Sequence, residues 1–364
     1  MAKTRLYDRH MALKGRMVEF AGWELPVQYP TGPIVEHNTV RTKAGLFDID
    51  HMGQLVVTGP AAAAYLNHVV TYDITKMAMH EAHYGLACYP DGGVVDDLFV
   101  YRLPDRYFVA INASNTAKDA TWFQAHTHGF NVTVRNVSAE TYMLALQGPL
   151  AEKILQPLTG TDLSKMPFHT AQDGQVTGAP TLITRGGYTG EDGFELFFPA
   201  DKAPQVWDAI MAEGQPQGLL PIGLAARDSL RFEPCMPLYG QEIGPEISPI
   251  EAGLGWGVSL DKADFIGRDA LLKEKLEGTE VKLVGFEMVD KGVPRHTYPV
   301  LIDGLEVGEV TTGMFAPTPK KYVGLAFVPA DSAKLGTELE IVIRDEPKRA
   351  VVVKRPFYTP AYRR

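Results

Sequence analysis

Apolar and polar residues alternate over many short stretches of the chain, which is the period of a half-buried β-strand. The alternation predicts an early strand and turn over residues 16–29 and one strand over residues 46–60, which ends in Gly-Pro. Further strands are expected at residues 83–89, 94–101, 106–112, 142–147, 181–184 and 194–198. The sequence Pro-Asp-Gly-Gly predicts that the first two of these form a hairpin.

Helical patterns lie between these strands. They cover residues 34–43, 61–69, 116–127, 202–213, 224–232 and 268–275. Gly45 is the expected C-cap of the first helix, and Pro60 is the expected first residue of the second. Because the connections are mostly short, this order of elements favours antiparallel α+β sheets over a Rossmann array.

Beyond residue 278 the pattern is that of strands alone. Six are expected, at residues 282–288, 299–302, 306–311, 322–327, 338–343 and 350–353. Short strands at regular spacing are typical of a small β-barrel or sandwich. The charged helical segment before Gly278 is the best linker candidate, so we expect a main region over residues 1–278 and a C-terminal β-barrel over residues 280–364.

The composition is that of a globular protein, with 364 residues of which 45% are hydrophobic and 22% charged. The longest apolar stretches fall short of a membrane span, and the first ten residues lack the apolar centre of a signal peptide. The two cysteines, Cys88 and Cys235, form no zinc motif and suit a reducing compartment. A formal charge of −9 argues against bulk binding to nucleic acid, although the mildly basic C-terminal part could help to dock an acidic partner protein.

Two adjacent carboxylates, Asp96 and Asp97, lie in the strand that follows the glycine turn. Since successive side chains of a strand point to opposite faces, one of the two should point inward among apolar neighbours. A buried carboxylate is costly unless it is paired or has a shifted pKa, so the inward one is either ion-paired or catalytic. From these residues alone, a structural aspartate that anchors the turn is the favoured interpretation.

Other candidates each have a structural alternative. Glu195 begins a strand and could accept hydrogen bonds from the N–H groups of a heteroaromatic ring, or pair with an arginine. Arg227 could bind a ligand or pair with Asp228. The aromatic and sulfur side chains that stand out are individually more typical of core or surface positions: Tyr84, Tyr101, Tyr188, Tyr362 and Met52. No nucleophile with a local base and no metal-ligand spacing is evident.

Seven motifs occur in order along the chain. They are Phe-Ala-Gly-Trp at 20–23, Phe-Asp-Ile-Asp-His-Met at 47–52, Gly-Gly-Val-Val-Asp-Asp-Leu at 92–98, Leu-Gln-Gly-Pro at 146–149, Gly-Tyr-Thr-Gly-Glu-Asp-Gly-Phe-Glu at 187–195, Ala-Arg-Asp-Ser-Leu-Arg at 226–231 and Leu-Tyr-Gly-Gln-Glu at 238–242. Together they resemble the aminomethyltransferase family, the T-proteins of the glycine cleavage system. The resemblance starts so close to Met1 that we expect no organellar transit peptide and a cytoplasmic location.

The resemblance implies a multi-domain cloverleaf of two interleaved antiparallel α+β subdomains, roughly 1–50 with 138–250 and 51–137, and a C-terminal all-β barrel. It also implies a reaction in glycine catabolism. The one-carbon unit on the aminomethyl-lipoyl arm of H-protein passes to tetrahydrofolate, which releases ammonia and gives 5,10-methylenetetrahydrofolate. The implied partner is lipoylated H-protein, the co-substrate is tetrahydrofolate, and no metal, nucleic acid or membrane is involved.

Carried over position by position, the catalytic aspartate of the family falls on Asp97, which leaves Asp96 with a structural role on the opposite face. The residues that match the folate contacts are Glu195, Arg227 and Tyr362, with Tyr84, Tyr188, Asn112 and Met52 as further pocket members. A carboxylate near the folate nitrogens would position the ring, relay a proton and stabilise a developing iminium cation. Glu195 would hold the amino edge of the pterin by charge-assisted hydrogen bonds.

Two other interpretations stay open. One is another tetrahydrofolate-dependent transferase on this fold, such as a demethylase of a small methylated substrate or the folate module of a dimethylglycine-oxidising enzyme. The complete Gly-Gly-Val-Val-Asp-Asp run disfavours this alternative. The other is a non-enzymatic folate-binding helper of iron–sulfur assembly, in which a Cys normally stands where this chain has Leu238. Pro234-Cys235 and Pro319 depart from the family pattern. These departures concern the conformation of the local backbone and not the function.

Overall fold

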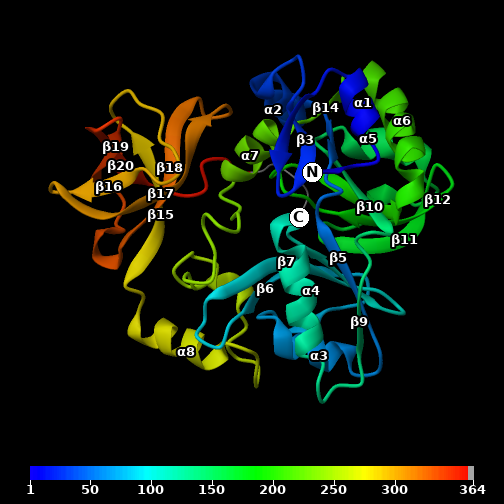
Figure 1. The fold of residues 1–364 in the computed structure, drawn as a ribbon, viewed down its shortest axis with the longest axis horizontal. Coiled ribbons are helices and arrows are strands. Elements are labelled where there is room, and N and C mark those ends of the chain that lie inside the picture. The colour runs from blue at the N-terminus through cyan, green and yellow to red at the C-terminus, as the bar shows by residue number, and fades with distance from the viewer. Residues whose placement is uncertain (360–364) are drawn as a thin grey trace.

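The computed structural model describes residues 1–359, which form three lobes (Figure 1). Two lobes are α+β and the third is a closed β-barrel. The chain builds part of the first lobe and all strands of the second, returns to the first, and ends in the barrel. The predicted fold class is confirmed, while the domain limits at 278 and 280 stay a prediction.

The first lobe is built on a six-stranded sheet of order β11-β12-β13-β10-β4-β14. Its strands are β4 (Gly45–Asp48), β10 (Thr141–Gln147), β11 (Thr170–Val176), β12 (Ala179–Arg185), β13 (Gly193–Pro199) and β14 (Leu220–Pro221). Its helices are α1 (Tyr7–Ala12), α2 (Pro33–Thr42), α5 (Ala151–Leu155), α6 (Ala203–Gly214) and α7 (Leu224–Phe232). A small sheet of β1 (Ala2–Lys3), β2 (Arg16–Phe20) and β3 (Trp23–Gln28) completes it.

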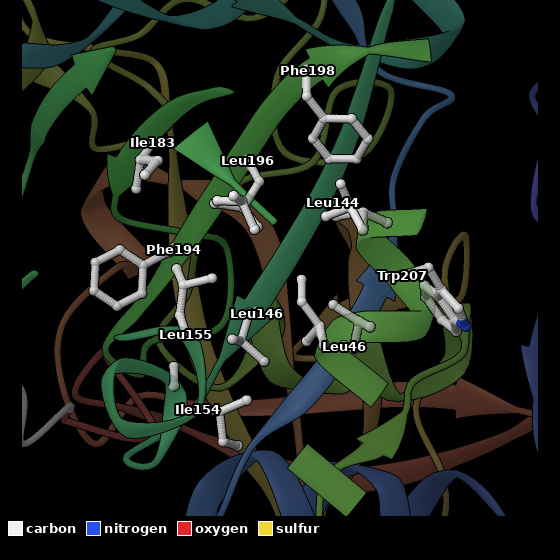
Figure 2. Packing of buried hydrophobic residues seen from close by; sticks show 14 of the residues in the cluster. Leu46, Leu144, Leu146, Ile154, Leu155, Ile183, Phe194, Leu196, Phe198 and Trp207 are labelled. Atoms are coloured by element: carbon white, nitrogen blue, oxygen red, sulfur yellow. The ribbon is translucent and has the colours of Figure 1, made fainter. Parts of the chain in front are cut away.

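The core of the first lobe lies between the sheet and its helices (Figure 2). Alternate residues of β10, Leu144 and Leu146, meet Leu196 of β13 and Trp207 of α6 there. Full burial of each such side chain contributes about 1.5–3 kcal/mol. The helix predicted over residues 202–213 is α6, which buries Val206, Trp207, Ile210 and Met211 on one face.

The second lobe is a five-stranded sheet of order β6-β7-β8-β5-β9, covered by two helices. Its elements are β5 (Gly53–Thr58), α3 (Ala62–Val69), β6 (Ala82–Cys88), β7 (Val94–Arg102), β8 (Tyr107–Ile111), α4 (Thr116–Ala125) and β9 (Thr133–Asn136). The predicted hairpin is β6 with β7, which are antiparallel and pair Leu86 with Asp97. The turn that joins them therefore fixes where Asp97 lies.

The barrel closes through β15-β18-β17-β16-β19-β20, with β20 paired to β15. Its strands are β15 (Val281–Met288), β16 (Pro299–Ile302), β17 (Leu305–Ala316), β18 (Lys321–Pro329), β19 (Glu338–Ile343) and β20 (Glu346–Val353). The chain reaches it from α7 through residues 233–267, which pack an apolar cluster against β6 and β7, and then α8 (Arg268–Glu277). Among residues 1–359, no helix is both long and apolar enough to cross a lipid bilayer.

The prediction of one strand over residues 46–60 is wrong. These residues form β4 and β5, which belong to different lobes. The strand breaks after Asp48, whose buried carboxylate accepts hydrogen bonds from Thr4, His10 and Tyr142 of the first lobe. The connection at residues 49–52 therefore runs from one lobe to the other.

Smaller errors concern helix ends and the edge strands, of which β1, β9, β11 and β14 were not predicted. Gly45 does not cap α2 but begins β4, where a Cβ atom would lie 2.3 Å from Ile222. Pro60 precedes α3 and its N-cap, Ala61. Strand β11 was not predicted, because its edge position leaves Gln172 and Asp173 exposed and removes the apolar alternation.

Candidate active site

A cavity of about 1090 Å³ lies where the three lobes meet. Seven of the eight predicted site residues line it: Met52, Tyr84, Asp97, Asn112, Tyr188, Glu195 and Arg227. They come from the connection between the lobes, from the second lobe and from the first lobe, so that only the assembled fold brings them together. The eighth, Tyr362, lies outside the described residues.

The two adjacent aspartates of β7 point to opposite faces of the sheet. Asp97 lines the cavity together with Phe99 and Tyr101, two and four residues further along the strand. Asp96 is fully buried on the other face, where Asn115 Nδ2 donates a hydrogen bond of 2.8 Å to its Oδ1. The strand period that the sequence displays therefore separates the two carboxylates as expected.

Asn112 forms hydrogen bonds to both carboxylates, although the two lie on opposite faces of β7. Because β7 and β8 are antiparallel and pair Leu98 with Ile111, the next residues, Asp97 and Asn112, also come together. Asn112 Nδ2 donates to Asp97 Oδ1 at 2.6 Å and to Asp96 Oδ1 at 2.9 Å, and its backbone N–H donates to Asp96 Oδ2 at 3.0 Å. Burial, together with the charge of Asp96, raises the pKa of Asp97 to about 7.

Aromatic rings form the walls beside Asp97. Tyr84 stacks on Trp256 with ring centroids 5.1 Å apart and meets the edge of Phe99 at 5.8 Å. Its hydroxyl approaches Asp97 without a hydrogen bond of full geometry. Tyr84, Phe99 and Trp256 all line the cavity, so this wall is aromatic.

Glu195 and Arg227 supply opposite charges at another wall. Glu195 Oε2 accepts a 3.4 Å hydrogen bond from the Tyr101 hydroxyl, and within residues 1–359 it makes no ion pair with an arginine. Burial raises the pKa of Glu195, and the nearby charge of Arg227 opposes that rise. Both charged side chains therefore line the cavity without an ion-pair partner among the described residues.

The alternative in which Arg227 pairs with Asp228 is wrong. Asp228 Oδ1 instead accepts a 2.8 Å hydrogen bond from Arg231 Nε, one turn further along α7. The Arg227 guanidinium lies 4.8 Å from the ring centroid of Tyr188 and donates no side-chain hydrogen bond in the described part of the chain. Its N–H groups are thus available to a ligand.

Two polar residues of this region were not among the site residues predicted from the sequence. His51 lines the cavity, and its buried Nδ1 has no hydrogen-bond partner within residues 1–359. Burial lowers the pKa of His51 to about 3, so the ring is neutral at physiological pH. Asp119 lies on the buried face of α4, beside Ala120 and Phe123. A carboxylate on the apolar stripe of a helix was the signal that could have identified it.

Over residues 1–359, no group of three or more His, Cys, Asp or Glu side chains is arranged to hold a metal ion. Cys88 and Cys235 are free cysteines. The polar groups of the cavity are instead single hydrogen-bonding and charged groups set among aromatic rings.

The turn before the carboxylates depends on Gly93. A Cβ atom on Gly93 would lie 1.8 Å from the carbonyl oxygen of Pro245, whereas a Cβ on Gly160 would meet nothing within 4 Å. We expect Gly93→Ala to lower the free energy of unfolding by about 1–3 kcal/mol, because the clash is with backbone. Thermal denaturation of both variants measures this. Equal melting temperatures for Gly93→Ala and the control Gly160→Ala would refute it.

The fold and the cavity define an enzyme whose site, enclosed between two α+β lobes and a barrel, suits a planar ligand with polar edges. Comparison with known proteins identifies its family. Residues 6–262 match the family model described as the GCVT N-terminal domain, and residues 282–359 match the glycine cleavage T-protein C-terminal barrel domain. The chain therefore belongs to the glycine cleavage T-protein family of aminomethyltransferases, which confirms the resemblance drawn from the seven motifs.

Individual relatives match this chain over its whole length. The chain is 50% identical over 359 residues to an aminomethyltransferase of Desulforamulus reducens, covering 98% of each chain. It is 49% identical over 366 residues to that of Herpetosiphon aurantiacus, covering 100% of both. It also matches the crystal structure of glycine cleavage system aminomethyltransferase T from Bartonella henselae with a TM-score of 0.94 and 32% identity, over 100% of this chain and 99% of the other.

Proposed function

We propose that this enzyme transfers the one-carbon unit of an aminomethyl group, carried on the lipoyl arm of H-protein, to tetrahydrofolate. The products are ammonia, 5,10-methylenetetrahydrofolate and the free lipoyl thiol. The observation that carries the proposal is the convergence of Asp97, Glu195 and Arg227 on one aromatic-walled cavity of about 1090 Å³. A cavity of this size suits a ligand as large as a folate.

The polar groups of the cavity fit a pterin. Tyr84 and Tyr188 line the cavity and supply aromatic surface for a planar heterocycle. Glu195 can accept hydrogen bonds from the amino edge, and Arg227 has unpaired N–H groups for a carbonyl or carboxylate oxygen. His51 also lines the cavity, where its neutral ring adds a further polar group beside a ligand.

Asp97 is the proposed catalytic residue. Transfer of the methylene carbon forms two carbon–nitrogen bonds, and the two folate N–H protons that leave end on ammonia and on the lipoyl thiol. The ionised carboxylate of Asp97 can accept such a proton and pass it on. Between the two bond-forming steps it faces a developing iminium cation, and a fixed negative charge acts most strongly in a site from which water is excluded.

The rate should depend on the ionisation of Asp97. Since burial and the charge of Asp96 raise its pKa to about 7, the carboxylate is protonated, and inactive as a base, below that pH. We expect kcat/KM for tetrahydrofolate to fall about tenfold for each pH unit below about 7. A pH series of ammonia release measures this. A rate that stays level from about pH 8 to about pH 5 would exclude a role for ionised Asp97.

The overall proposal is tested with purified protein, tetrahydrofolate and aminomethyl-loaded H-protein. Formation of ammonia and methylenetetrahydrofolate that depends on both substrates is the expected result. Folate binding without product would contradict the proposal and favour a demethylase or an iron–sulfur assembly helper. Lipoylated H-protein as partner and a cytoplasmic location belong to the same proposal.

A further inference from the structure

A buried ionic network lies outside the cavity, where the first lobe meets the barrel. Its centre is Arg41 near the end of α2, whose side chain is 6% exposed. Arg41 Nη1 donates to the backbone carbonyl oxygen of Thr189 at 2.6 Å and to Glu191 Oε1 at 3.0 Å, and Nη2 donates to Glu233 Oε2 at 2.9 Å. Because charge-assisted hydrogen bonds of a forked guanidinium are strong and directional, Arg41 fixes the groups around it.

One of the segments that Arg41 holds is a wall of the cavity. Residues 186–188 of the loop between β12 and β13 line the cavity, and Thr189 and Glu191 follow directly. Four of the eight residues 186–193 are glycines, so the backbone by itself restricts this loop little. The position of Tyr188 therefore depends on the contacts that the rest of the loop makes.

The second segment is the chain that leaves the barrel after β20. Residues 354–356 line the cavity, and Tyr358 follows two positions later. The Tyr358 hydroxyl donates to Glu191 Oε1 at 2.6 Å, although the two residues are 167 positions apart. Its ring centroid lies 4.0 Å from the Arg41 guanidinium, and its backbone N–H donates to the carbonyl oxygen of Glu233 at 2.9 Å. Tyr358 thus connects the segment after β20 to the loop that carries Tyr188.

We propose that Arg41 and Tyr358 are positioning residues for the folate site. Arg41 holds Glu191, and the hydrogen bond from Tyr358 to Glu191 fixes the wall of residues 186–188 relative to the wall of residues 354–356. Neither Arg41 nor Tyr358 lines the cavity, so both act on a ligand through these two walls. A wall that is ordered before the ligand arrives lowers the entropic cost of binding. This inference rests on the proposed function, since it takes tetrahydrofolate as the ligand.

Two substitutions test this role. Tyr358→Phe removes one hydroxyl group and keeps the ring beside Arg41. We expect Kd and KM for tetrahydrofolate to rise about two- to tenfold, as for the loss of one hydrogen bond, while kcat at saturating tetrahydrofolate stays at the wild-type level. Arg41→Lys keeps the positive charge but loses the fork that reaches Thr189, Glu191 and Glu233 together, so its rise should be larger. A binding titration with tetrahydrofolate and steady-state kinetics measure both variants.

The matched control for a loss of stability alone is Ile154→Val. Ile154 is fully buried in the core of the first lobe and does not line the cavity, so this variant should lower the melting temperature and keep the wild-type Kd. A wild-type Kd in folded Tyr358→Phe would overturn the proposal, even if Arg41→Lys fails to fold. If Tyr358→Phe binds tetrahydrofolate more weakly but the wild-type protein forms no methylenetetrahydrofolate, the proposed function fails while the positioning role stands.

Discussion

Asp97→Asn should fold and bind tetrahydrofolate but lose turnover by about 10²- to 10⁴-fold, the range expected when a general acid–base group is removed. The asparagine oxygen can still accept the 2.6 Å hydrogen bond from Asn112 Nδ2, so the local geometry should persist. What disappears is the negative charge in a buried site and the capacity to take up a proton. Ammonia release and methylenetetrahydrofolate formation measure the loss, and a binding titration with tetrahydrofolate measures retention of the site.

The matched control is Asp105→Asn. Asp105 follows β7 in the same lobe, but its side chain is 72% exposed and pairs with Arg106. Surface pairs of this kind contribute little, so turnover and folate binding should both stay at the wild-type level. If Asp97→Asn behaves like this control, the carboxylate of Asp97 has no role in the chemistry.

The sequence predicted the parts of the fold that are governed by local pattern. The barrel strands and the β6–β7 hairpin follow from alternation and from turn residues, which act over a few positions. The opposite orientations of Asp96 and Asp97 follow from the strand period alone. The family resemblance then selected the residues of the cavity, since no local rule relates Asp97 to Glu195 or Arg227.

The predictions of structure fail where the hydrogen-bond partners of a residue are distant in the chain. The break between β4 and β5 depends on Asp48, whose partners Thr4 and Tyr142 are 44 and 94 residues away. Such long-range pairings are decided by tertiary packing, which short windows of sequence do not contain. The open alternative that Asp228 pairs with Arg227 fails for a local reason, because the helix period brings Asp228 to Arg231.

Arg231→Leu should lower the free energy of unfolding by about 3–5 kcal/mol, because it leaves a buried carboxylate without its cation. The side chains of Arg231 and Glu242 are each 1% exposed, and Nη1 of the arginine donates to Oε2 of the glutamate at 2.9 Å. The same guanidinium donates to Thr312 of the barrel at 3.1 Å. This one side chain therefore joins α7, the 233–267 segment and β17. Urea denaturation of the variant and wild type measures the loss.

A second substitution, at Glu242, shows whether the loss of stability comes from the unpaired charge of this carboxylate. Glu242 keeps hydrogen bonds of 2.6 Å from both Thr311 and Thr312, and a neutral glutamine can still accept from one of them. Arg231→Leu/Glu242→Gln should therefore regain part of the stability that Arg231→Leu loses. Arg349→Leu, which breaks the exposed pair with Asp290, serves as the control and should change stability little. A double variant less stable than Arg231→Leu would mean that the arginine acts through its packing, and that the barrel is held to α7 by shape more than by charge.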